Sequence, residues 1–129
     1  MDASEAKAFC EGWLGAWTGN RPAALLAFYA DDALYRDPGR PHGLRGHAQL
    51  RPYFERLLEA NPAWEWRALE TLPTPGGFTL KWRARIPVGA EIIEEEGLDI
   101  VEVDAGRITR NEVYFDRSAL LAAFAAKKK

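Results

Sequence analysis

The chain has 129 residues, of which 47% are hydrophobic and 28% charged, and its formal net charge is −2. This length and composition fit one globular domain spanning residues 1–129 and leave no room for two. A nucleic-acid-binding domain normally carries a basic patch, and the one basic run here, Lys127–Lys129, is expected to be a solvated tail.

The cysteine and histidine content argues against a disulfide framework and against a metal centre. Cys10 is the single cysteine, which excludes an intrachain disulfide and fits a reducing compartment. His42 and His47 are not spaced with carboxylates as metal ligands are, and the sequence has no phosphate-binding or nucleotide-binding motif. We therefore predict no metal and no cofactor.

The N-terminal residues and the hydropathy pattern indicate a cytoplasmic location. The N-terminus is acidic, and no apolar run approaches the roughly 18 residues that a membrane-spanning helix needs. We expect neither a signal peptide nor a membrane partner.

Amphipathic helices are predicted in the first half of the chain. They begin at residue 3, at Pro22 and at His47, and they end before Gly19, Asp31 and Asn61. Asp2 and Glu5 are placed to form a capping box for the first helix. Between the second and third helices, residues 33–36 predict a short strand and residues 38–46 a loop rich in glycine and proline.

Strands are predicted in the second half of the chain. From Phe78 to Ile86, apolar residues alternate with polar and charged ones, which is the strongest strand signal in the sequence. Further strands are expected from residue 64, over 98–103 and over 108–115, and Ser118 is expected to begin a short final helix. Because short turns join these strands, we expect antiparallel pairing and an α+β fold, with helices on one face of a curved sheet.

Several motifs resemble the nuclear transport factor 2-like superfamily, and within it the group of SnoaL-like polyketide cyclases and ketosteroid isomerases. They are Tyr29-Ala30-Asp31-Asp32-Ala33, Asp37-Pro38, Gly46 at a helix start, Gly97-x-Asp99, Gly106-Arg107-Ile108 and Tyr114-Phe115-Asp116. The resemblance implies a cone-shaped, mixed, mainly antiparallel sheet that curls around a deep pocket and packs on three N-terminal helices. It also implies a homodimer formed through the outer face of the sheet.

The charged residues of the central strand would then face outward. Lys81, Arg83 and Arg85 would lie at the dimer interface, facing the stretch Glu91–Glu96, or would form a solvated charged face.

The resemblance also implies a set of site residues. Asp37 matches the catalytic base of ketosteroid isomerases, and Asp99 matches the protonated aspartic acid of their oxyanion hole. The tyrosine of that set falls on Trp13, which has an indole N–H and no acidic hydroxyl; this departure counts against steroid isomerisation. The cyclases of the group use a pocket aspartate as acid and base, a part that Asp116 or Asp37 could take. Eight residues are predicted to contact the ligand: Trp13, Tyr29, His47, Tyr53, Trp66, Trp82, Tyr114 and Asp116.

Each of these residues also has a structural interpretation. An Asp-Pro pair such as Asp37-Pro38 is a common turn former. Asp99 could instead pair with Arg45 or Arg110, since a buried carboxylate needs a partner or must be neutral. The five tryptophans could simply fill the core.

Two functions of different classes follow. The first is a cofactor-free protein that binds a small apolar organic molecule and moves a proton at carbon, giving isomerisation, aldol-type cyclisation or dehydration, with Asp37 as base. The second is a non-catalytic ligand-binding or protein-association module. Asp37 and Asp99 in one open pocket would favour the enzyme, whereas arginine-paired carboxylates or a filled cavity would favour the module. Epoxide hydrolysis is a third alternative, but the sequence has no clear Asp-Arg-Asp set for it.

Overall fold

The computed structural model describes residues 1–127, so Lys128 and Lys129 of the predicted basic tail lie outside the described residues. In chain order the elements are α1 (Ala3–Gly15), α2 (Pro22–Leu26), β1 (Tyr29–Asp37), β2 (Arg40–Arg45), α3 (His47–Ala60), β3 (Glu65–Thr74), β4 (Gly77–Val88), β5 (Glu91–Asp104), β6 (Arg107–Tyr114) and α4 (Ser118–Lys127).

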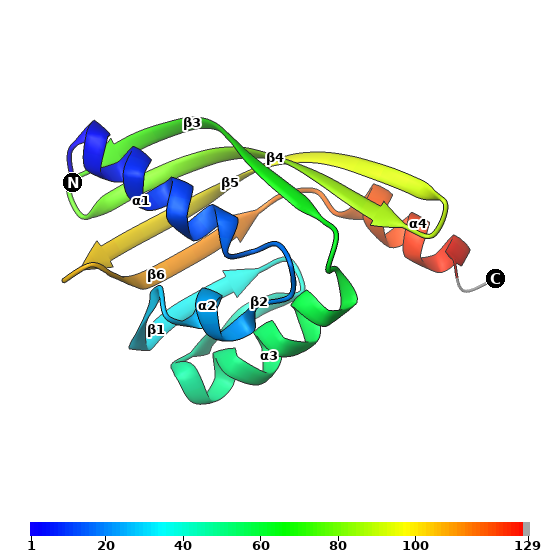
Figure 1. The fold of residues 1–129 in the computed structure, drawn as a ribbon, viewed down its shortest axis with the longest axis horizontal. Helices are drawn as coiled ribbons and strands as arrows, with labels where there is room; N and C mark the ends of the chain where they lie inside the picture. Colours follow the sequence, from blue (N-terminus) through cyan, green and yellow to red (C-terminus); the bar gives the residue numbers. More distant parts are fainter. Residues whose placement is uncertain (128–129) are drawn as a thin grey trace.

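The strands form one mixed sheet in the order β2-β1-β6-β5-β4-β3. Strands β3 to β6 pair antiparallel through short turns, as predicted. Strand β1 runs parallel to β6, which requires the long connection through α3 and the four strands β2 to β5. Figure 1 shows the long strands twisting and curving across the helices. The predicted α+β fold with a curved, mainly antiparallel sheet is therefore confirmed.

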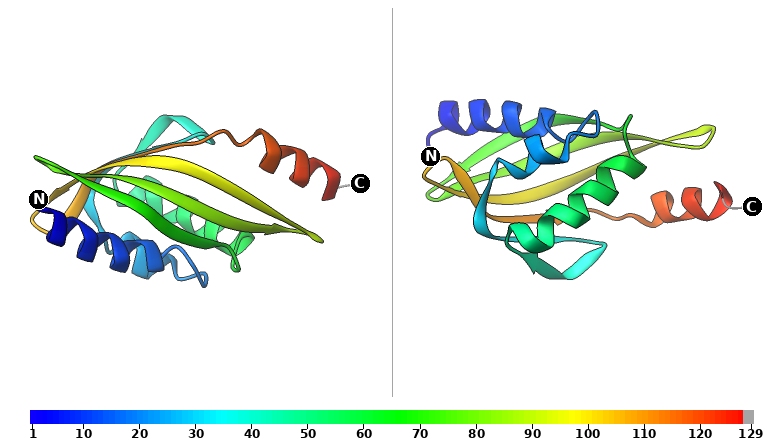
Figure 2. Two further views of the ribbon diagram at one scale, coloured as in Figure 1. Left: turned by 90° about the horizontal axis from the view of Figure 1, so that it is seen from above. Right: turned by 60° about the horizontal axis from the view of Figure 1, so that its bottom comes forward.

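The helices bury their apolar stripes against the sheet. The predicted capping box is present, because Asp2 accepts from the Glu5 backbone and Glu5 accepts from the Asp2 backbone. Helix α1 packs on β3 and β4, and α3 packs on β1 and β2. Figure 2 shows α1, α2 and α3 together, with α4 apart from them, near the β4–β5 hairpin. The core lies between these helices and the sheet, with Trp13 and Phe54 among its largest buried side chains.

Two local predictions in the region of residues 29–46 are wrong. The second helix was predicted to continue to residue 30, but α2 ends at Leu26 and β1 begins at Tyr29, which pairs with Ile108 of β6. Residues 40–45 were predicted as a loop but form β2, which pairs with β1 at the edge of the sheet. An edge strand tolerates Pro41, since one side of it needs no backbone donors.

The outer face of the sheet carries the predicted charged residues. Lys81 and Arg85 are exposed, and Arg83 forms ion pairs with Glu94 at 2.6 Å and Glu96 at 3.3 Å. The central arginine thus faces the glutamate-rich stretch of β5, as expected. Within residues 1–127, no helix is long and apolar enough to span a membrane.

Candidate functional site

A cavity of about 200 Å³ opens between the sheet and helices α1, α3 and α4. It is far larger than the roughly 10–15 Å³ that one water molecule needs. Its wall is mostly aromatic and aliphatic, and it includes the side chains of Trp13, Trp17, Trp64, Trp66 and Trp82. Asp37 and Asp99 are the two acidic residues on this wall.

Asp37 lies at the end of β1, at the half-exposed end of the cavity, and three donors surround its carboxylate. Its Oδ2 accepts hydrogen bonds from the hydroxyls of Tyr35 at 2.8 Å and Tyr53 at 2.5 Å. Its Oδ1 accepts from the backbone N–H of Gly39 at 2.8 Å. These bonds fix the orientation of the carboxylate.

The two tyrosines beside Asp37 remain protonated donors. Burial and the neighbouring Asp37 raise the pKa of Tyr35 well above its usual range. Burial and the hydrogen bond to Asp37 likewise raise the pKa of Tyr53. Tyr53 also stacks under the Arg40 guanidinium, which lies 5.0 Å from the ring centroid.

Asp99 lies on β5 deep in the cavity, and its side chain is buried. The indole N–H of Trp82 donates to Oδ1 at 2.7 Å, and the amide of Asn111 donates to Oδ2 at 2.9 Å. Burial raises the pKa of Asp99 to about 7, against the opposing effect of these two hydrogen bonds. The alternative partner Arg110 instead forms ion pairs with Glu102 and Glu112.

A buried hydrogen-bond chain supports Asp99 from behind. Trp13 Nε1 donates to the Tyr29 hydroxyl at 3.3 Å, and that hydroxyl donates to Oδ1 of Asn111 at 2.8 Å. Burial raises the pKa of Tyr29 well above its usual range, so it stays a donor. The ring of Trp13 therefore forms part of the cavity wall, while its N–H donates to Tyr29 and does not face a ligand. Tyr29 lies behind the wall rather than on it.

Trp66 and Trp82 make one side of the cavity. Their rings meet edge to face with centroids 4.8 Å apart, and Trp66 packs in the same way on Trp64 at 5.0 Å. Among residues 1–127, the buried Nε1 of Trp66 has no hydrogen-bond acceptor. Tyr53, Trp66 and Trp82, which were predicted to contact the ligand, thus lie on the cavity wall.

Besides Tyr29, three predicted ligand contacts lie off the cavity wall. Tyr114 is on the outer face of the sheet, where its hydroxyl donates to Glu112 at 2.5 Å. Asp116 is exposed and accepts from the backbone N–H of Ser118, the first residue of α4, at 2.9 Å. His47 Nε2 lies 2.8 Å from the backbone oxygen of Tyr29. None of the three side chains lines the cavity that holds Asp37 and Asp99.

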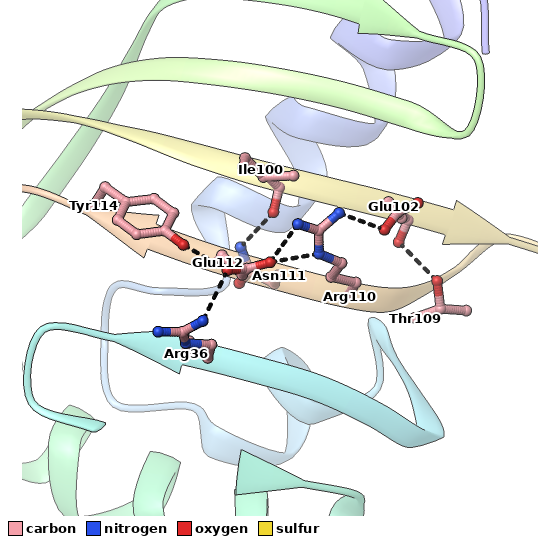
Figure 3. Close-up of polar contacts among 8 residues, drawn as sticks. All are labelled: Arg36, Ile100, Glu102, Thr109, Arg110, Asn111, Glu112 and Tyr114. Atoms are coloured by element: carbon pink, nitrogen blue, oxygen red, sulfur yellow. Dashed lines mark hydrogen bonds and ion pairs between the residues drawn. The ribbon is translucent and has the colours of Figure 1, made fainter. Parts of the chain in front are cut away.

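The outer face carries a charge network of its own (Figure 3). Glu112 is almost buried there and contacts Arg110 at 2.5 Å and Arg36 at 3.5 Å. The hydroxyl of Tyr114 and the charge of Arg110 lower the pKa of Glu112. Arg110 extends the network to Glu102 at 2.8 Å. Glu112 and Asn111 are neighbours on β6 and point to opposite faces, so this network is separate from the Asp99 site.

Three residues of the site were not predicted. Tyr35 could have been found, because it precedes Asp37 by two positions and shares a face of the strand with it. Asn111 could have been found as a polar residue at an inward-facing position of β6. Arg117 lies on the cavity wall between β6 and α4, and no local pattern indicates this.

In the part of the chain that the structure describes, no group of three or more acidic, histidine or cysteine residues is placed to hold a metal ion.

Comparison with known proteins identifies the family of the chain. The sequence of residues 10–111 matches the SnoaL-like domain family. The chain belongs to this family. A SnoaL-like chain with this fold is thus a member of the nuclear transport factor 2-like superfamily, as the motifs predicted.

Individual relatives have different activities. A protein from Nocardioides simplex named steroid Δ-isomerase is 29% identical over 114 residues, covering 88% of this chain and 91% of its own. A hypothetical protein from Catenulispora acidiphila, solved in complex with trimethylamine and described as having a ketosteroid isomerase-like fold, superimposes with a TM-score of 0.79 at 19% identity. That match covers 91% of this chain and 92% of the other. An epoxide hydrolase of the LEH-like kind from M. tuberculosis superimposes with a TM-score of 0.76 at 20% identity, covering 97% of this chain and 92% of the other. The structural matches establish the fold alone.

Proposed function

We propose that this protein binds a small apolar carbonyl compound and catalyses proton transfer at carbon without a cofactor. Asp37 is the base, and it removes a proton from a carbon next to the carbonyl. The resulting enolate carries its charge on oxygen, where the protonated carboxyl of Asp99 donates a hydrogen bond. Asp37 then returns the proton to another carbon, which completes an isomerisation. In an aldol-type cyclisation the enolate would instead form a carbon–carbon bond.

One observation carries the proposal. Two carboxyl groups share a largely apolar cavity but have opposite environments: three donors hold Asp37 in place, whereas Asp99 is buried and readily protonated. A buried, protonated carboxyl group that shares a cavity with a second carboxylate held by hydrogen bonds is typical of an acid–base pair. Within residues 1–127 neither carboxyl group forms an ion pair with an arginine, and the cavity is open, which favours the enzyme over the binding module. The similarity to a steroid Δ-isomerase supports the same reaction class.

The test uses two ketones with acidic C–H bonds, 5-androstene-3,17-dione and 2-tetralone. Isomerisation of the first is followed by ultraviolet absorbance, and deuterium exchange into the second by NMR. We expect Asp37→Asn to lower both rates by roughly a hundredfold or more, the usual contribution of a general base. Asp32→Asn is the matched control, because Asp32 is on the same strand with an exposed side chain.

The pH dependence provides a second readout. Burial raises the pKa of Asp99 to about 7, so its donating form is lost as the pH rises through that value. Activity should fall over the same range, and Asp99→Asn should remove this decline. Wild type that binds the ketones without isomerising or exchanging them would refute the enzyme and favour the non-catalytic module.

We further propose that the protein is cytoplasmic and forms a homodimer through the outer face of the sheet. Leu98 and Tyr114 are about half exposed on the outer face of the sheet, at 47% and 48%, beside the Glu112 network. Exposed apolar groups next to fixed charges suit a self-complementary interface. Sedimentation velocity of wild type and Leu98→Glu would test it, and we expect the substitution to give monomers.

A further inference from the structure

We propose that Arg117 binds a carboxylate group of the ligand, so that the protein prefers an apolar keto acid to the corresponding neutral ketone. This inference rests on the proposed function only in that the cavity holds an organic ligand. It concerns the half-exposed end of the cavity, called here the rim and formed by Asp37, Gly39, Tyr53 and Arg117.

The rim brings the Arg117 guanidinium close to the proposed base. A methyl group placed at Gly39 would lie 3.3 Å from Nη1 of Arg117, 3.3 Å from Oδ1 of Asp37 and 3.7 Å from the Tyr53 hydroxyl. All three groups therefore surround one small space. The absence of a side chain at Gly39 leaves this space open to a ligand.

Arg117 has no carboxylate partner in residues 1–127, although two aspartates are near it in space or sequence. Asp37 does not pair with it, and both Asp37 oxygens already accept from Tyr35, Tyr53 and Gly39. Asp116, its neighbour in the chain, is exposed and bonds to Ser118 instead. The guanidinium is thus a half-buried cation beside a mostly apolar cavity, and it makes no hydrogen bond to the described residues.

The chemistry of a guanidinium selects the ligand group. Its planar fork matches a carboxylate with two parallel hydrogen bonds, which are strong when partly shielded from water. A ligand whose apolar body fills the tryptophan-walled cavity would place such a group at the rim. Because Arg117 and Asp37 flank the same space, the carbon that Asp37 deprotonates would lie close to the carboxylate.

The test compares two probes that share a ring system and differ in charge, 2-naphthoate and the neutral ketone 2-acetylnaphthalene. Binding to wild type, Arg117→Gln and Arg117→Lys is measured by isothermal titration calorimetry at constant ionic strength. Arg40→Gln is the matched control, because Arg40 is an exposed arginine beside the same rim that does not line the cavity. Circular dichroism verifies that each variant is folded.

We expect Arg117→Gln to weaken 2-naphthoate binding about tenfold to a hundredfold, the range for hydrogen bonds to a charged group. Binding of 2-acetylnaphthalene should change less than twofold, Arg117→Lys should be intermediate, and Arg40→Gln should leave both unchanged. An equal loss for both probes, an equal effect of Arg40→Gln, or no naphthoate binding by wild type would overturn the inference. The proposed function fails separately, through unchanged ketone turnover in Asp37→Asn.

Discussion

The indole of Trp82 reaches the buried carboxyl of Asp99 by crossing directly over Gly97, and its N–H donates to Oδ1 at 2.7 Å. A side-chain carbon at Gly97 would lie 2.7 Å from Cη2 of Trp82 and 2.7 Å from the backbone oxygen of Tyr114. The spacing Gly97-x-Asp99 therefore has a physical basis: the glycine leaves room for the ring that binds the acid.

Gly97→Ala should accordingly displace Trp82 and weaken its bond to Asp99. Overpacking of this kind costs about 1–3 kcal/mol, and we expect the free energy of unfolding in urea to fall by that amount. The control is Gly15→Ala at the end of α1, where an added methyl group meets nothing within 4 Å. An unchanged urea midpoint for Gly97→Ala would show that the ring can shift at no cost.

The stability of the protein should depend on the protonation of Asp99. Burial raises the pKa of Asp99 from 3.8 to about 7, so between these values the folded state holds a proton that the unfolded state has lost. The contribution is fully present below pH 3.8 and is lost as the pH rises through about 7, with a slope of at most about 1.4 kcal/mol per pH unit.

Urea denaturation between pH 4 and pH 8 measures this dependence. Wild type should lose stability relative to Asp99→Asn as the pH rises, because the substituted amide does not ionise. Parallel pH profiles for the two proteins would contradict the burial of an ionisable group at this position.

Asn111 is predicted to set the acidity of Asp99. Its amide donates to Asp99 and thereby opposes the effect of burial. Asn111→Leu should raise the pKa of Asp99 above about 7, which a ¹³C NMR titration of the aspartate carboxyls would detect. Tyr29→Phe is the control, since it removes the bond to Asn111 but leaves the bond from Asn111 to Asp99. An Asp99 pKa that falls or stays constant in Asn111→Leu would refute this role.

The β5–β6 turn offers a stabilising substitution. Ala105 has φ of 51° and Gly106 has φ of 79°, so both central residues of this hairpin are left-handed, a conformation that costs alanine about 1 kcal/mol. Ala105→Asn should raise the free energy of unfolding by about 0.5–1 kcal/mol, because asparagine tolerates this conformation. Ala90→Asn is the control, since Ala90 lies in the β4–β5 turn without a positive φ. A gain of the same size in both variants would point to a cause other than the backbone.

Local sequence patterns predicted most of the elements correctly. The alternation from Phe78 to Ile86 gave β4, the apolar stripes gave α1 and α3, and Asp2 with Glu5 gave the capping box. These patterns involve residues that are close in the sequence, so they do not depend on contacts with distant segments. The resemblance in short motifs also indicated the superfamily and the two acidic residues.

What the sequence could not determine depends on contacts between distant segments. Residues 29–32 open β1, in which Tyr29 pairs with Ile108 of β6, almost eighty residues later, and this distant contact overrides their turn-forming composition. Similarly, Tyr114 and Asp116 alternate with Val113 and Phe115, yet only the latter two line the cavity. Which face of a strand points inward depends on register, and register depends on the whole sheet.

The sequence therefore identified the acidic residues of the site, and the tertiary structure decided where they lie and what surrounds them. The sequence determined that Asp37 and Asp99 are present, in a chain rich in tryptophan. Only the tertiary structure placed both on one cavity, gave Asp37 its donors Tyr35 and Tyr53, and brought Arg117 to the rim. The physical reason is that burial and hydrogen bonding, which decide the chemistry of a carboxyl group, arise from residues far apart in the chain.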